Sequence, residues 1–184
     1  MKIEYEIKDV KVVRHSTIAA ALATVYGPAV HAKERVDLVG GLMGRNFHVA
    51  DPHYYLLHQP LAREYEGESV YRRTCALVTL DRDWQPSEFS QELDKKGYYR
   101  ASTSETVAYL GRFKEQRVDL GTVVHLGTFI LDDVYQQRRL VTRDGKVDLP
   151  VVLPTTRLKH YHMIVVIEKE VPFVPKRAFF GRKK

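Results

Sequence analysis

The sequence is poor in cysteine and in long apolar runs, and both shortages narrow the kind of protein it can encode. Cys75 is the single cysteine, so the chain cannot form an internal disulfide and must be stabilised by packing. Cys75 lies in an apolar stretch, which favours a small buried side chain over a reactive thiol. No run reaches the roughly 18 apolar residues that a membrane-spanning helix requires, and the start of the chain is too acidic for a signal peptide. We therefore expect no membrane association and a cytoplasmic location, or the virion for a particle component.

Several catalytic signatures are absent as well. The chain contains no GxSxG nucleophile elbow, no P-loop and no GxGxxG loop. It also lacks internal repeats and low-complexity segments, which excludes a solenoid. We accordingly expect no cofactor, and a binding or assembly role is favoured over catalytic turnover.

The pattern of apolar residues predicts an α+β fold with a mostly antiparallel sheet. A composition of 44% hydrophobic and 28% charged residues is typical of a globular domain, which we place at residues 1–171, followed by a basic tail over 172–184. Three or four helices are expected to pack on the sheet, and the C-terminal half is expected to be rich in strands. The expected elements are strands over 2–14, 70–80, 120–131, 134–143 and 146–153, and helices beginning at 18, 86 and 103, with a further helix over 29–38.

One hairpin is marked by its turn residues. Asp144 and Gly145 are the pair that a type I′ turn prefers, so the strands on either side are expected to pair. Pro150 lacks a backbone N–H, so the returning strand is expected either to lie at an edge of the sheet or to contain a bulge. Polar side chains occupy both faces of the strand before the turn. We therefore expect the hairpin to project from the body and to contact a partner.

The positive charge of the chain is concentrated at its end. Lysine and arginine exceed aspartate and glutamate by 29 to 23, and the last nine residues hold five cations, two aromatic rings and no acid. Such a segment is suited to contact with phosphates, although a solvated tail that maintains solubility has a similar composition. The residues expected to bind nucleic acid there are Lys176, Arg177, Phe179, Phe180, Arg182, Lys183 and Lys184.

Aromatic and basic residues elsewhere favour the same function. Eleven tyrosines and seven phenylalanines offer stacking surfaces, and phosphate contacts are expected from Arg72, Arg73, Arg138 and Arg139. We therefore predict a non-catalytic subunit that binds RNA, DNA or another polyanion, or that docks with protein partners in a nucleoprotein assembly. The alternative is a structural component of a viral or phage particle, which would have a similar composition.

Residues 157–168 are predicted to form a long apolar strand that carries two histidines on one face. His160 and His162 alternate with Tyr161 and would point the same way as Ile164. Because the strand is so apolar, we expect these histidines to be packing residues, of which at least one is buried, neutral and hydrogen-bonded.

The sequence His160-Tyr161-His162 resembles the HUH motif of relaxase, replication-initiator and transposase nucleases. The resemblance covers about five residues. It implies a second alternative, a metal-dependent nuclease of single-stranded DNA in which two histidines bind a divalent metal ion and a tyrosine attacks the phosphodiester. The third metal ligand in this alternative is His125, and the candidate nucleophiles are Tyr98, Tyr99 and Tyr109.

Overall fold

The computed structural model describes residues 1–26, 70–115, 121–131, 135–143 and 146–169. The predicted helix over 29–38 and the basic tail lie outside these ranges. None of the helices in the described ranges has the length and apolar character that crossing a membrane requires. The elements in chain order are β1 (Lys2–Val13), α1 (Ile18–Tyr26), β2 (Val70–Thr79), α4 (Pro86–Lys95), β3 (Tyr98–Arg100), α5 (Thr103–Glu115), β4 (Thr122–Leu131), β5 (Gln137–Arg143), β6 (Lys146–Asp148) and β7 (His162–Glu168).

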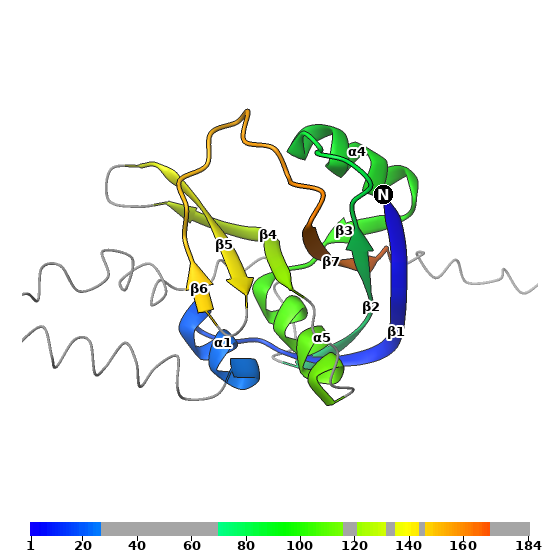
Figure 1. The fold of residues 1–184 in the computed structure, drawn as a ribbon. Coiled ribbons are helices and arrows are strands. Elements are labelled where there is room, and N and C mark those ends of the chain that lie inside the picture. The colour runs from blue at the N-terminus through cyan, green and yellow to red at the C-terminus, as the bar shows by residue number, and fades with distance from the viewer. Residues whose placement is uncertain (27–69, 116–120, 132–134, 144–145, 170–184) are drawn as a thin grey trace, which may run out of the picture.

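A seven-stranded sheet organises the described chain (Figure 1). Six strands follow the order β1-β2-β7-β4-β5-β6, and β3 pairs with β7 off this path. Every pairing is antiparallel except that of β4 with β7. The predicted α+β fold with a mostly antiparallel sheet and a strand-rich C-terminal half is therefore confirmed.

The central strands are buried on both faces. Along β2, Cys75 and Leu77 point into a core that also holds α1 and α5. Ala76 and Val78 point to the opposite face, into a second core that contains Phe89 of α4. This division explains why β2 and β7 contain continuous apolar runs instead of strict alternation. It also buries Cys75 completely, and burial raises the pKa of its thiol to about 12.

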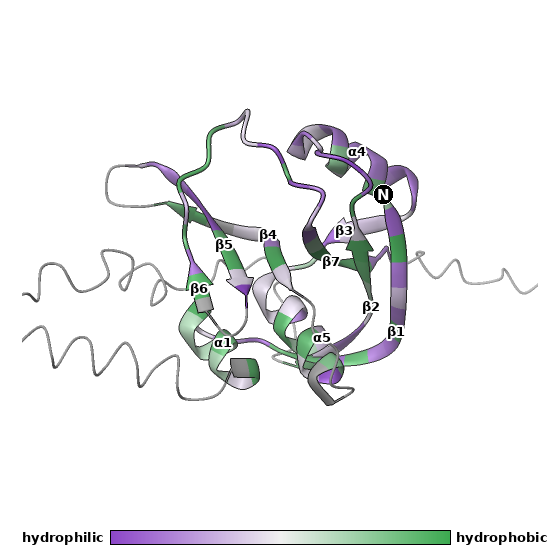
Figure 2. Ribbon diagram, viewed as in Figure 1, coloured by the Kyte–Doolittle hydropathy of each residue, from purple (hydrophilic) through white to green (hydrophobic). Residues whose placement is uncertain are grey.

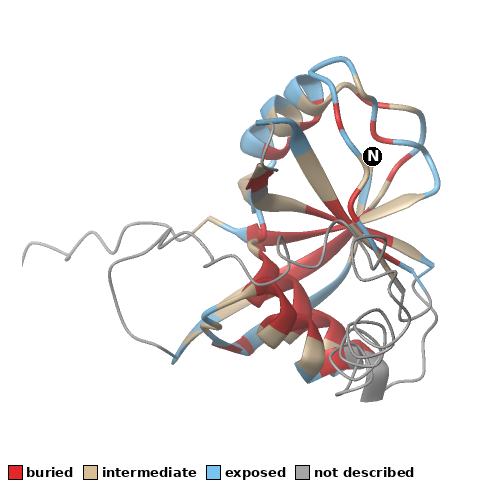
Figure 3. Cartoon of the chain, turned by 90° about the vertical axis from the view of Figure 1, so that its left-hand side faces the viewer, coloured by how far each residue is buried: buried red, intermediate tan, exposed pale blue. Residues whose placement is uncertain are grey.

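Helix composition follows the amount of surface that each helix buries. The apolar α1 packs with α5 against one face, whereas α4 is mostly hydrophilic and buries only Phe89 and Leu93 (Figure 2). Buried residues accordingly gather where the strands cross the middle of the molecule (Figure 3).

The helices begin where the sequence predicts them. Thr17 caps α1, because its Oγ1 accepts a hydrogen bond from the backbone N of Ala20 at 3.1 Å. Pro86 occupies the first turn of α4. Ser102 and Glu105 form a reciprocal capping box at α5, with N–O distances of 2.8 Å and 3.3 Å.

Strand β1 is long but irregular. Its pairing with β2 shifts register twice, between Glu4 and Ile7 and between Ile7 and Val10. Tyr5 and Asp9 adopt positive φ angles of 50° and 55° at these shifts. The break expected within residues 2–14 is therefore a pair of bulges, which bend β1 around the sheet.

The predicted hairpin is present as β5 and β6, with Arg143 paired to Lys146. Its turn, residues 144–145, lies outside the described residues. Strand β6 ends the sheet and Pro150 follows it, as expected for an edge. The paired part of the hairpin lies in the sheet instead of projecting from it, because β5 also pairs with β4 and buries Leu140 and Thr142. The polar composition of β5 conceals this position in the sheet, because only Leu140 and Thr142 of the strand are buried.

The histidine strand is shorter than predicted. Strand β7 begins at His162, and the backbone N of His162 donates to the carbonyl of Lys159 at 2.9 Å, which closes a turn. His160 therefore lies in a turn, not in a strand. The strand does not extend back to Leu158, because the backbone of Leu158 pairs with Trp84 in the segment that follows β2.

Candidate nucleic-acid interface

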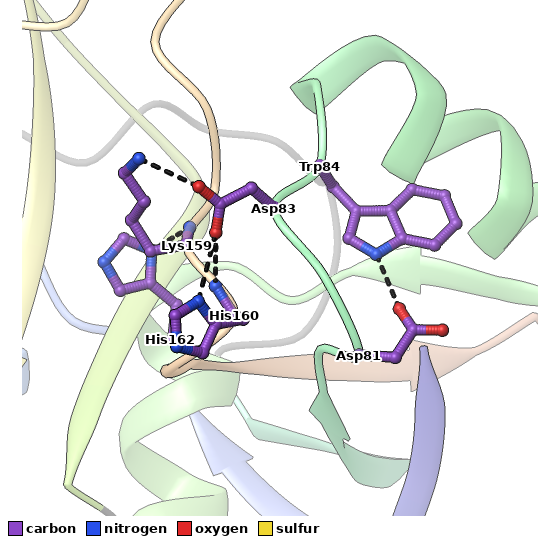
Figure 4. A network of polar contacts seen from close by, with 6 residues as sticks. All are labelled: Asp81, Asp83, Trp84, Lys159, His160 and His162. Atoms are coloured by element: carbon purple, nitrogen blue, oxygen red, sulfur yellow. Dashed lines mark hydrogen bonds and ion pairs between the residues drawn. The ribbon is translucent and has the colours of Figure 1, made fainter.

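Two segments that are far apart in the sequence are joined at Trp84 and Leu158. The backbone N of Trp84 donates to the Leu158 carbonyl at 2.9 Å, and the Leu158 N donates to the Trp84 carbonyl at 2.8 Å. Both side chains are buried in the core that contains Phe89. This pair fixes the residues on either side of it, so that Asp83 faces Lys159 and His160 (Figure 4).

Asp83 is the centre of a polar network. Its Oδ2 accepts from Lys159 Nζ at 2.9 Å, and its Oδ1 accepts from the backbone N of His160 at 3.0 Å. The same Oδ1 lies 3.3 Å from His160 Nδ1. The hydrogen bond from Lys159 and the further donors on His160 lower the pKa of Asp83 to about 2. The carboxylate is thus ionised at neutral pH and can only accept, which places a proton on His160 Nδ1.

His162 is held in the other tautomer. Its Nδ1 accepts a hydrogen bond from the backbone N of Lys159 at 3.1 Å. Burial lowers the pKa of His162 to about 4, and the positive charge of Arg139 contributes. The ring is therefore neutral at pH 7 and carries its proton on Nε2. His162 is half-buried, whereas the side chain of His160 is 68% exposed.

Tyr161 stands between the two imidazoles. Its ring centroid lies 5.5 Å from that of His160 and 4.8 Å from that of His162, with interplanar angles of 82° and 84°. These edge-to-face contacts fix the phenol ring while 58% of the residue stays exposed. We refer to Lys159, His160, Tyr161 and His162 as the 159–162 turn.

The surroundings of the turn carry positive charge. Lys159 is partly exposed and Arg157 is exposed. Arg82, which lies next to Asp83 in the chain, stacks over the Trp84 ring with its guanidinium carbon 4.2 Å from the centroid. An exposed aromatic ring thus lies on the same pair of segments as three cationic side chains.

The predicted phosphate contacts on β2 lie at the other end of β7. Arg72 and Arg73 line a small open pocket of about 150 Å³, together with Asp9, Thr74, Glu168 and Lys169. Arg72 donates to the Asp9 carbonyl at 3.2 Å, and Arg73 Nε lies 3.8 Å from Glu105 Oε1. Lys169 is the last described residue before the basic tail. The structure therefore brings Arg72 and Arg73 beside Lys169.

The two arginines predicted on β5 form a separate group. Arg138 donates to the Leu149 carbonyl at 3.2 Å, and Arg139 donates to the Thr156 carbonyl at 3.4 Å. Both are partly buried, and β7 and β4 separate them from β2. They hold the segment between β6 and β7 against the sheet. The predicted residues of the tail, Lys176, Arg177, Phe179, Phe180, Arg182, Lys183 and Lys184, lie outside the described ranges.

The residues of the nuclease alternative lie apart. His125 is buried and pairs across the sheet with Leu140, a residue of the core that holds α1 and α5. His162 alternates with Met163, which packs on that core, and so faces the other side of the sheet. In the described ranges, no group of three or more His, Cys, Asp or Glu side chains could hold a metal ion.

The candidate nucleophiles are also distant from the turn. Tyr98 and Tyr99 pair with Glu168 and Ile167, at the opposite end of β7 from His162. These partners are six and five residues from His162, which is about 20 Å and about 17 Å along the strand at about 3.3 Å per residue. Tyr109 is fully buried, and its hydroxyl donates to the Tyr5 carbonyl at 2.8 Å.

Sequence reasoning overlooked Asp83, which precedes His160 by 77 residues and has no local motif around it. Lys159 and Tyr161 lie within the strand predicted over 157–168, in which side-chain alternation would place Tyr161 on the opposite face from the two histidines.

No protein-family model, curated protein or solved structure matches the chain.

Proposed function

We propose that the protein binds single-stranded nucleic acid, RNA or DNA, through the 159–162 turn. The observation that carries the proposal is the exposed ring of Tyr161, held between two imidazoles in the same turn as the Lys159 ammonium. Every base has a π face that can stack on such a ring, and nearby cations attract the phosphates. This is the binding role that the basic and aromatic composition predicts. Composition alone did not indicate Tyr161 as its location.

The rigidity of the turn supports this proposal. Asp83 binds both Lys159 and His160, and the Trp84–Leu158 pair fixes the two segments against each other. A ring that is already held in place loses little conformational entropy when a base stacks on it. Pre-organisation of this kind therefore favours a binding surface over an incidental exposed tyrosine.

The distribution of cations supports contacts along more than one nucleotide. Arg82, which also pairs with Glu88, and Arg157 flank the turn, whereas Arg72 and Lys169, which pairs with Asp94, lie at the far end of β7. We propose that Arg72 and the tail supply these further phosphate contacts.

The test is binding of fluorescein-labelled oligouridine and oligothymidine, measured by fluorescence anisotropy. Tyr161→Ala removes the ring, and we expect its dissociation constant to rise about 5- to 150-fold, since stacking on an aromatic side chain contributes about 1–3 kcal/mol per base. Comparison of the two probes distinguishes RNA from DNA.

Tyr161→Phe is the matched control, because it keeps the π face and removes only the hydroxyl group. We expect it to bind as the wild type does. The proposal fails if the wild type binds neither probe, or if Tyr161→Ala and the wild type bind equally well.

A further inference from the structure

We propose that the 159–162 turn also cleaves bound RNA without a metal ion, with His160 as the general base. This activity depends on the proposed binding function, because RNA must first bind at Tyr161. The observation behind it is that the turn holds a base, a residue that orients the base, and two donors for a phosphate. The base is His160, the residue that orients it is Asp83, and the two donors are Lys159 and His162.

His160 has the geometry of an oriented base. Its Nδ1 lies 3.3 Å from Asp83 Oδ1, and the ionised carboxylate keeps the proton on that nitrogen. The lone pair is therefore on Nε2, and the side chain is 68% exposed, so that a substrate can reach it. Asp83 is a positioning residue, since it acts through the imidazole and is itself occupied by Lys159.

Two donors in the turn suit a phosphate. Lys159 carries an ammonium, of which one proton binds Asp83 and two remain for other acceptors. His162 accepts from the backbone through Nδ1, and its Nε2–H can donate. Both groups are fixed before the substrate arrives, which is the condition under which donors stabilise the charge that develops on phosphoryl oxygens.

The reaction is an internal transesterification. His160 Nε2 removes the proton of a 2′-hydroxyl group, and the 2′-oxygen attacks the adjacent phosphorus. The bond from phosphorus to the 5′-oxygen breaks, and the leaving oxygen takes a proton from water. The hydroxide that remains takes the proton from His160, so the enzyme returns to its starting state. The products are a 2′,3′-cyclic phosphate and a 5′-hydroxyl end, and no oxidant, reductant or metal ion is consumed.

The experiment uses a 5′-fluorescein-labelled RNA, the same sequence as DNA, and the same sequence with 2′-O-methyl groups, each incubated with the full chain in EDTA. We expect cleavage of the RNA alone, resolved on a denaturing gel, because the other two probes lack the attacking hydroxyl group. His160→Gln should lower the single-turnover rate about 100-fold or more, the usual contribution of a general base. His15→Gln, at a histidine between β1 and α1, should cleave at the wild-type rate.

Asp83→Asn tests the positioning role through a split between rate and affinity. We expect the rate at saturating protein, where all of the RNA is bound, to fall by a larger factor than the affinity for RNA, with melting temperatures measured to exclude unfolding. Three results would overturn the inference: cleavage that persists in His160→Gln, cleavage that requires a divalent metal ion, or binding of RNA without any cleavage. Each of them would leave the proposed function standing. Absence of RNA binding would overturn both.

Discussion

The imidazole of His125 lies wholly inside the core. Its Nε2 is 3.2 Å from Thr142 Oγ1, and its Nδ1 has no hydrogen-bond partner in the described ranges. Burial lowers the pKa of His125 to about 3, because a charged imidazole cannot be solvated there. A residue considered as a metal ligand on sequence grounds is thus a neutral core residue with one polar atom unsatisfied.

His125 makes the fold sensitive to acid. Its pKa is lower in the folded state than the ordinary value of 6.5, so between pH 6.5 and about 3 only the unfolded chain binds the proton. The free energy of unfolding should fall in that window by up to about 1.4 kcal/mol per pH unit on account of this residue. We expect the non-titrating His125→Gln to show a correspondingly flatter dependence in urea denaturation between pH 7 and pH 5. Parallel pH profiles for the two proteins would contradict this assignment.

Strand β4 and helix α5 approach closely where Gly127 meets the start of the helix. A Cβ at Gly127 would lie 2.2 Å from the Ala101 carbonyl oxygen and 2.9 Å from the Ser102 N. Both are backbone atoms and cannot move as a flexible side chain would. The register of β4 with β5 also shifts in this region, between His125 and Ile130. The glycine therefore sets the distance between the sheet and the helix.

Two glycine-to-alanine substitutions distinguish the steric effect of the close approach at Gly127 from the general effect of replacing a glycine. Gly127→Ala should destabilise the protein by about 1–3 kcal/mol, since the backbone must shift to admit the methyl group. Gly111→Ala, within α5 and with no atom inside 4 Å of the new Cβ, should stabilise it by about 0.5–1 kcal/mol. Denaturant midpoints measure both. Equal effects of the two substitutions would contradict the close approach.

Local signals predicted the elements well, and long-range contacts account for what they missed. Thr17, Pro86 and the Ser102–Glu105 pair act within one turn of a helix, so the sequence alone reveals them. The start of β7 depends instead on Leu158 pairing with Trp84, a contact that no periodicity encodes. The same contact positions Asp83, and for that reason the candidate site could be predicted only as a pair of histidines.

Across the whole molecule, positive charge is expected to govern binding. The net charge is +6, and five cations lie between Lys176 and Lys184. The division into a domain over 1–171 and a tail over 172–184 stays a prediction, as does the part of the tail in binding. Every phosphate that a cation neutralises steepens the salt dependence of the affinity for a single strand.

Truncation after Pro175 tests the tail. If each of the five cations neutralises one phosphate, the slope of log K against log salt should become shallower by about 3.5, at about 0.7 per contact. Titrations of labelled oligouridine at several salt concentrations measure the slope. Replacement of Phe179 and Phe180 by leucine keeps the charge and should leave the slope unchanged. An unchanged slope and affinity after truncation would exclude the tail from binding.

The bulges of β1 affect whether several molecules can associate through the edges of their sheets. In the described part of the chain, β1 and β6 end the strand order of the sheet, and the three-residue β3 pairs only with β7. Strand β1 bends at Tyr5 and Asp9, and β6 covers only three residues. A strand from a second molecule could form few consecutive hydrogen bonds along either border. In the described part of the chain, these irregularities oppose polymerisation through the borders of the sheet.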